Sequence, residues 1–274
     1  MWNMSGLPDC NSYSKGVDAY SAFYPCESSY RQRLEYGAAG QPVQSRDKLM
    51  KLLSKSFKIL KSDHSGKGYI TVILYLSPAS ESGYQLCPFR TTACEGACLG
   101  HSSGRMVMDA SKAARIRRTV MLMQERVAFG NQIIKEIAAH ERKASKLDVL
   151  PAVRLNGDSD VRWDTMRFDG KTLMEHFPGV VFYDYTKWPN HLRPDSDIHL
   201  TFSRGETTTN EEIQANLDNG RNVAVVFHSV PATWNGWTVI DGDADDLRFL
   251  DPTVVIVGLK AKGKARKDTS GFVV

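Results

Sequence analysis

The sequence lacks any apolar run of the roughly 18 residues that a membrane-spanning helix needs. Its first residues also lack the basic start and apolar core of a signal peptide, so we expect a cytoplasmic protein. No phosphate-loop motif, no Gly-x-Ser-x-Gly elbow and no His-Glu-x-x-His motif is present. These absences exclude several common classes of hydrolase and nucleotide hydrolase.

The sequence also lacks a strong excess of one charge, because it contains 35 Lys and Arg residues and 31 Asp and Glu residues. The resulting net charge of +4 permits an acidic partner such as nucleic acid but does not indicate one by itself. The 274 residues, of which 42% are apolar, suffice for one large domain or two small ones. Five cysteines in a cytoplasmic chain point to metal ligands or free thiols rather than to disulfides.

Three of these cysteines, Cys87, Cys94 and Cys98, share one short loop. Thiolates are soft ligands, and three in one loop suit an iron–sulfur cluster or a zinc ion. With a four-iron, four-sulfur cluster, three thiolates leave one iron open to a cofactor or substrate. With zinc, His101 would complete a closed, structural Cys3His site. The spacing C-x6-C-x3-C matches neither the common zinc pairs nor the bacterial ferredoxin run, and three neighbouring thiols without a metal are the remaining alternative.

Short apolar segments alternate with helical patterns along most of the chain. This alternation predicts parallel β/α units, and six strands fit a partial (β/α)6 barrel or an open parallel sheet. We assign residues 1–68 to an N-terminal arm with a helix, and residues 69–274 to a β/α core that carries the cysteine loop. The six expected strands are Tyr69–Leu76, Val149–Leu155, Val180–Tyr183, Ile198–Phe202, Asn222–Phe227 and Val254–Val257.

Three helices are expected. Residues 1–45 form an irregular arm with Cys10 and Cys26, and apolar spacing then predicts a helix over residues 46–61. A long helix should run from residue 109 to about 143, with a kink or a break at Gly130. Its inner stripe contains Ile116, Val120, Met123, Val127, Ile133, Ile134 and Ile137. A third helix over residues 209–219 begins with a Thr-x-x-Glu capping pattern.

Polar residues follow the first five expected strands, and in parallel β/α folds such loops lie together at one edge of the sheet. We take them as cofactor-binding candidates, with no catalytic residue assigned. Lys187, Arg204 and Glu206 are suited to pair with a carboxylate, phosphate or ammonium group. The alternative for Asp158 and Asp160 is the capping of local turns. The full set is Asn156, Gly157, Asp158, Asp160, Lys187, Ser203, Arg204 and Glu206.

Two basic segments are candidates for contact with phosphates. Residues 112–118 carry Lys112, Arg115, Arg117 and Arg118 on the expected long helix. Residues 260–267 form a basic, glycine-interrupted tail, for which a solvated and flexible segment is the alternative.

Several motifs occur together, namely Cys87-Pro…Cys94…Cys98-Leu, residues 114–119, 154–160, 182–187 and 199–204, and Gly258-Leu-Lys-Ala-Lys-Gly263. This combination resembles a family of bacteriophage proteins called gene product 88. The resemblance covers roughly residues 70–274 and implies a phage-encoded protein that acts in the bacterial cytoplasm, without implying an activity.

The cysteine loop also resembles that of radical S-adenosylmethionine (SAM) enzymes. Their fold is a partial six-stranded β/α barrel whose three cluster cysteines follow the first strand, and a segment after the second strand holds the amino group of SAM. The resemblance implies a cluster on Cys87, Cys94 and Cys98, with Asn156-Gly157-Asp158 beside SAM. The family spacing is C-x3-C-x2-C and its Gly-Gly-Glu is absent here, so cluster binding carries over more directly than SAM cleavage.

Two hypotheses follow from these features. The first is an iron–sulfur enzyme of radical-SAM-like architecture that modifies a nucleotide or nucleic-acid substrate. The second is a non-enzymatic protein, stabilised by zinc or by a cluster, that binds nucleic acid or a host protein.

Overall fold

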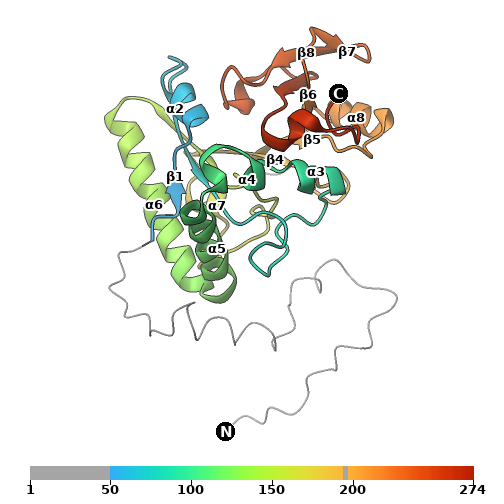
Figure 1. Ribbon diagram of the computed structural model, residues 1–274. Helices are drawn as coiled ribbons and strands as arrows, with labels where there is room; N and C mark the ends of the chain where they lie inside the picture. Colours follow the sequence, from blue (N-terminus) through green and yellow to red (C-terminus); the bar gives the residue numbers. More distant parts are fainter. Residues whose placement is uncertain (1–49, 194–196) are drawn as a thin grey trace. The chain divides into compact units, whose positions relative to one another are not determined.

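The computed structural model describes residues 50–193 and 197–274. Within them, Lys51–Val274 form one compact unit that is built on a nine-stranded sheet (Figure 1). The irregular arm expected over residues 1–45 lies outside the described residues.

The sheet has the strand order β1-β2-β3-β4-β5-β6-β9-β8-β7. All neighbours from β2 to β8 are parallel, whereas β1 and β7 pair antiparallel at the two edges. The strands are β1 (Leu53–Ser54), β2 (Tyr69–Leu74), β3 (Leu150–Arg154), β4 (Val181–Thr186), β5 (Ile198–Ser203), β6 (Val223–Phe227), β7 (Thr233–Trp234), β8 (Trp237–Asp241) and β9 (Ile256–Lys260).

The six expected strands correspond to β2, β3, β4, β5, β6 and β9, which lie side by side in the order of the chain. A mixed α/β unit with a mostly parallel sheet is therefore confirmed. Curvature of this sheet into a partial barrel stays a prediction. The β7–β8 hairpin is not among the expected strands, although its turn holds Asn235-Gly236, both at positive φ, which is the strongest short hairpin motif.

The expected long helix is two helices, α5 (Asp109–Gln124) and α6 (Arg126–Lys146), which pack against each other (Figure 1). The break falls at Glu125, so the expected interruption at Gly130 is wrong. Gly130 lies inside α6, where a Cβ atom would come within 2.5 Å of the Phe168 ring. This glycine therefore permits close packing rather than a kink.

The expected inner stripe of this helical region is buried only in its second part. Ile133 and Ile137 of α6 are fully buried, as is Phe129. Val127 is 78% exposed, so its assignment to the stripe is wrong. No helix within residues 50–193 and 197–274 combines the length and the apolarity that crossing a bilayer requires.

The helix expected over residues 46–61 is also shorter than predicted. The chain is extended through β1, and α2 (Phe57–Asp63) begins after Ser56, whose hydroxyl accepts the Ile59 amide at 3.3 Å. The Glu136 carboxylate of α6 accepts the amides of Leu52 and Leu53, at 2.9 and 2.8 Å. This long-range contact takes the amides that a helix would have used. The domain boundary at residue 68 stays a prediction, and α2 belongs to the same compact unit as the sheet.

The capped helix is confirmed as α8 (Asn210–Asp218), which begins with a capping box between Thr209 and Glu212. Its Ile213 and Leu217 pack on the apolar side chains of β5, β6 and β9. The remaining helical elements are α3 (Thr92–Ala97), α4 (Leu99–Ser102), η2 (Gly104–Val107), α7 (Leu173–His176), η3 (Arg248–Leu250) and η4 (Gly263–Lys267).

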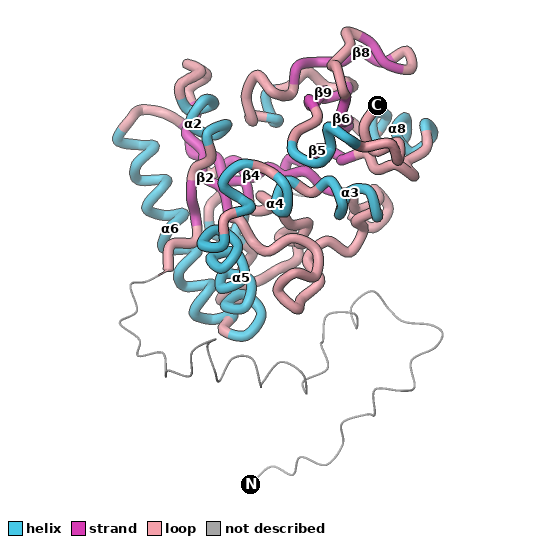
Figure 2. Tube along the Cα trace, in the orientation of Figure 1, coloured by secondary structure: helices cyan, strands magenta, loops and turns pink. Residues whose placement is uncertain are grey.

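The basic tail contains regular secondary structure and packs against the rest of the unit. Lys260 ends β9, and the 3-10 helix η4 follows, dark red in Figure 1, next to α3 and α4 (Figures 1 and 2). Ala261 and Ala265 are buried together with Ala97 of α3 and with Val273. The alternation of small apolar and basic residues places this segment against the cysteine-bearing helix.

Candidate functional site

The predicted site residues lie where four neighbouring parallel strands end. The cysteine loop follows β2, and the segment 156–160 follows β3. Lys187 comes directly after β4, and β5 ends with Ser203 before Arg204 and Glu206. The polar candidates thus occupy one edge of the sheet, which is where ligands bind in parallel α/β folds.

The three cysteines of the loop occupy three different backbone settings. Cys87 lies in the turn before α3, Cys94 lies within α3, and Cys98 ends α3 and begins α4. The hydroxyl of Thr91 caps α3 by accepting the Cys94 amide at 3.2 Å. All three are free thiols and half-buried.

The thiols share one electrostatic environment. Burial raises the pKa of Cys87 to about 12, and the neighbouring Asp160, Cys98 and Cys94 raise it further. Burial also raises the pKa of Cys98 to about 12, with Asp158 and Cys94 adding to the effect. Burial raises the pKa of Cys94 as well, although the charge of Lys187 opposes it.

These thiols do not form a finished ligand set. Within residues 50–193 and 197–274, no group of three or more His, Cys, Asp or Glu side chains is placed to hold a metal ion. Binding of a cluster or of zinc would therefore require the loop to rearrange and the thiols to release their protons.

Asp160 connects the second strand-end segment to its neighbours. Its carboxylate accepts the Lys187 amide at 2.7 Å and the Thr186 hydroxyl at 2.8 Å. Its own amide donates to the Leu86 carbonyl at 2.8 Å, which joins the segment to the cysteine loop. Arg193 lies 3.4 Å from the same carboxylate. Asp160 is therefore a buried structural acceptor, as well as a neighbour of the thiols.

Lys187 is directed at the end of β5. Its ammonium group donates to the Ser203 carbonyl at 2.9 Å and to the Arg204 carbonyl at 3.0 Å. Burial lowers its pKa, whereas Cys94 and Asp160 oppose that shift. The side chain links β4 to β5, and it lies beside the cysteine loop.

Glu206 and Arg204 are both engaged with protein groups. Glu206 accepts the Ala93 amide at 3.0 Å and the hydroxyl of Thr91, so it holds the first turn of α3. Arg204 donates to the Gly271 carbonyl at 2.8 Å and to the Phe272 carbonyl at 3.2 Å. These contacts join the end of β5 to the cysteine helix and to the segment after η4.

Asn156 is positioned by Asp184, which is not among the predicted site residues. The backbone and side-chain amides of Asn156 donate to the Asp184 carboxylate at 2.8 and 3.1 Å. Burial raises the pKa of Asp184 to about 7, against the opposing charge of Arg154. The available indication was a carboxylate inside the otherwise apolar and aromatic strand β4.

Asp158 and Arg115 form a second buried pair, with 3.8 Å between Nε and Oδ2. Burial raises the pKa of Asp158 to about 6, although Arg115 lowers it. Arg115 also donates to the Gly100 carbonyl at 2.8 Å and is only 2% exposed. The expected role of Arg115 as a phosphate contact is therefore wrong, because its charge is used inside the protein. On the same helix, Lys112 and Arg117 are exposed.

Gly157 allows the segment after β3 to approach the end of β2. Its amide donates to the Leu74 carbonyl at 2.9 Å. A Cβ atom at this position would lie 2.5 Å from the Tyr75 ring and 2.8 Å from the Leu74 carbonyl oxygen. Two of the candidate segments are thus in contact because residue 157 has no side chain.

Alanine at position 157 should lower the free energy of unfolding by about 1 to 3 kcal/mol, because the added methyl group overlaps backbone atoms. Gly96 of α3 is the matched control, since a Cβ atom there meets nothing within 4 Å. Gly96→Ala should be neutral or stabilising by up to about 1 kcal/mol. Urea denaturation followed by circular dichroism measures both, and equal effects of the two changes would contradict this account.

His101, the expected fourth zinc ligand, lies on α4. Its Nδ1 atom is 3.4 Å from the Glu81 carboxylate, which also pairs with Lys112 at 3.0 Å. Its backbone amide donates to the Cys98 carbonyl at 3.1 Å. The residue is thus next to the cysteine loop, with its ring oriented by an acidic partner.

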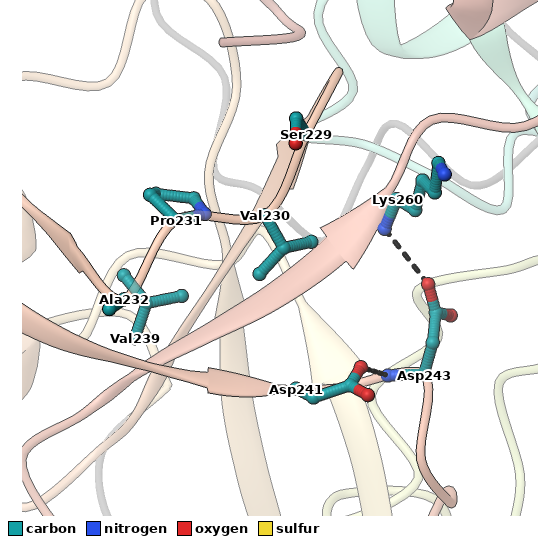
Figure 3. Close-up of a pocket in the computed structure, with 8 residues that line it drawn as sticks. All are labelled: Ser229, Val230, Pro231, Ala232, Val239, Asp241, Asp243 and Lys260. Atoms are coloured by element: carbon teal, nitrogen blue, oxygen red, sulfur yellow. Dashed lines mark hydrogen bonds between the residues drawn. The ribbon is translucent and has the colours of Figure 1, made fainter.

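A pocket of about 540 Å³ opens beside the ends of β8 and β9 (Figure 3). Asp243 lines it, accepting the Lys260 amide at 2.9 Å and donating its own amide to Asp241 at 2.8 Å. None of the predicted metal-binding or cofactor-binding residues lines this pocket. The polar groups of the candidate site instead bond largely to other protein groups, among them backbone amides and carbonyls.

The structure thus defines an α/β protein with a mostly parallel sheet and a cysteine loop at the carboxyl ends of its strands. The model of one family, gene product 88, matches residues 48–274. The chain therefore belongs to the gene product 88 family. No curated protein and no solved structure matches it significantly.

Proposed function

We propose that the protein is a phage-encoded iron–sulfur protein of radical-SAM-like architecture that acts in the cytoplasm of the host bacterium. Cys87, Cys94 and Cys98 would hold a four-iron, four-sulfur cluster. The observation that carries the proposal is the position of the three thiols in one loop at the strand ends, where Cys94 lies close enough to Cys87 and to Cys98 to raise the pKa of both. The six parallel strands in chain order support the partial-barrel relationship.

The chain's own residues have distinct roles in this proposal. The cluster, when bound, would supply an electron to SAM. Asn156, held by Asp184, and Gly157, held by Leu74, would present backbone and amide groups to the cofactor. Lys187 and Glu206 would keep α3 and the end of β5 in fixed positions. Asp158 would provide a buried carboxylate beside Cys98 for the amino group of SAM.

A zinc-stabilised, non-enzymatic protein is the second candidate, and one observation favours it. Histidine ligands of zinc commonly present their second ring nitrogen to a carboxylate. His101 has such a partner in Glu81. In this alternative the metal would brace the cysteine loop, and the protein would act by binding nucleic acid or a host protein.

Metal content distinguishes the two candidates. Full-length protein purified without oxygen should be brown and contain about four iron atoms per chain. With reductant and SAM it should then release 5′-deoxyadenosine. Colourless protein with about one zinc ion per chain would favour the second candidate. Protein that binds neither metal after anaerobic reconstitution would contradict both.

A further inference from the structure

The outer side of η4 carries three basic side chains next to the cysteine helix. We call Lys264, Arg266 and Lys267 the basic turn; all three are exposed. The turn is seated closely on α4, because a Cβ atom on Gly263 would lie 2.6 Å from the Ser102 carbonyl oxygen. Figures 1 and 2 both show η4 beside α3 and α4. The basic turn therefore has a fixed position near the strand-end site.

The three side chains of the basic turn form no ion pairs with carboxylates in the described part of the chain. Across residues 50–193 and 197–274, the structure shows no ion pair for its three side chains, whereas the preceding Lys262 pairs with Asp243 at 2.6 Å. The closest carboxylate in the sequence, Asp268, accepts the Val273 amide at 3.0 Å and the Ser270 hydroxyl at 2.7 Å. Three neighbouring cations are thus open to an external anion.

Aromatic rings continue this surface toward the end of β5. Phe272 is half-buried against the apolar side of η4, and the Lys187 ammonium group is 5.5 Å from its ring centre. Arg204 donates to the Phe272 carbonyl, and its guanidinium group lies 5.6 Å from the centre of the Trp234 ring. Trp234 in turn lies 5.8 Å from Trp237. Cationic and aromatic groups therefore alternate from the basic turn to the β7–β8 hairpin.

Proteins that bind single-stranded nucleic acids commonly combine cationic and aromatic side chains on one surface. Cations track the phosphates, and aromatic faces stack with bases irrespective of sequence. We propose that the substrate of the strand-end site is a single-stranded nucleic acid, with its phosphates on the basic turn and a base against Phe272. This inference rests on the proposed function for the reaction, but its binding surface is independent of the metal. A duplex would engage the cations alone, because its bases are already stacked.

Fluorescence anisotropy with labelled single-stranded DNA of about 15 nucleotides tests the basic turn in the full-length protein. The triple variant Lys264→Gln/Arg266→Gln/Lys267→Gln should weaken binding at least about tenfold. It should also reduce the slope of log K against log salt concentration by about 2 in magnitude. Each of the three lost phosphate contacts contributes about 0.7 to that slope. The matched control is Arg142→Gln/Lys143→Gln/Lys146→Gln, which removes three exposed cations from α6. This control should bind as the unmodified protein does.

The aromatic contact needs a separate variant. Phe272→Ala should weaken single-strand binding about tenfold while leaving the salt slope unchanged, because stacking involves no counterion. Phe272→Tyr should restore it. The control is Phe57→Ala, because Phe57 of α2 is 85% exposed. This substitution should leave single-strand binding unchanged. Thermal unfolding of each variant separates loss of a contact from loss of the fold.

Further probes decide between partners. Single-stranded RNA of the same sequence shows which sugar is preferred, and duplex DNA should bind at least about tenfold more weakly. Equal affinity for duplex, or binding to anionic lipid vesicles in place of oligonucleotides, would overturn the inference. Equal losses in the two triple variants would also overturn it. Metal analysis of the same preparations separates the two proposals. Protein that binds single-stranded nucleic acid but holds no metal would contradict only the proposed function. Protein that holds metal but does not bind single-stranded nucleic acid would contradict only this inference.

Discussion

Alanine at Cys87, Cys94 or Cys98 should reduce the iron bound after anaerobic reconstitution from about four atoms per chain to less than about one. The cluster needs three thiolates from one loop, and two remaining thiolates do not hold it against loss to solvent. The brown colour and the formation of 5′-deoxyadenosine should disappear with the iron. Because the thiols are half-buried and free, the metal-free variants should still fold.

The chain offers matched controls for this experiment in its two other cysteines, Cys10 and Cys26. Alanine at either position should leave the iron content and the spectrum unchanged. Iron that survives each substitution in the loop, or that falls equally with Cys10→Ala, would contradict the assignment of the ligands. His101→Ala adds a third measurement, since it should lower metal content only if the bound metal is zinc.

Removal of the Asp246 carboxylate should produce the largest loss of stability, about 3 to 5 kcal/mol for Asp246→Ala. The carboxylate lies 3.0 Å from Lys58 and 3.1 Å from Arg154, and it accepts the Tyr183 hydroxyl at 3.3 Å. Its side chain is only 2% exposed. Although burial raises the pKa of Asp246, the charges of Arg154 and Lys58 lower it to about 2, so the group is ionised at neutral pH.

The expected loss arises from the charges that would remain. Without Asp246, the half-buried Arg154 keeps one ion pair in the described part of the chain, to Asp184 at 3.8 Å. Urea denaturation at pH 7 measures the effect. Asp218 of α8 is the matched control, because it is exposed and Asp218→Ala should change stability by less than about 0.5 kcal/mol. A loss below about 1 kcal/mol for Asp246→Ala would contradict this account of the network.

Much of the sheet was predictable, because β-branched and aromatic residues concentrate in short segments. The segment after residue 69 and the segment after residue 198 were placed to within a few residues, and the Thr209 capping box was recognised. The position of the cysteine loop after the first parallel strand followed from chain order alone. An element is therefore predictable where its local pattern and its tertiary contacts agree.

Errors occurred where a distant residue competes with the local pattern. Glu136 takes the amides of Leu52 and Leu53, and the helix expected there starts later. The sequence pattern places Arg115 among several surface cations, but in the structure it is buried, next to the Gly100 carbonyl and Asp158. Residues 241–246 include four aspartates, a composition typical of a solvated loop, yet the Asp246 carboxylate is buried and pairs with Lys58 and Arg154.

The sequence by itself determined the alternation of strands and helices, the family, and the presence of three thiols in one loop, because these depend on local composition and spacing. Only the tertiary structure decided which polar groups meet. Asp184 holds Asn156, Lys187 holds the end of β5, and η4 lies against the cysteine helix. The physical reason is that buried polar groups must find partners, and those partners come from segments far apart in the chain.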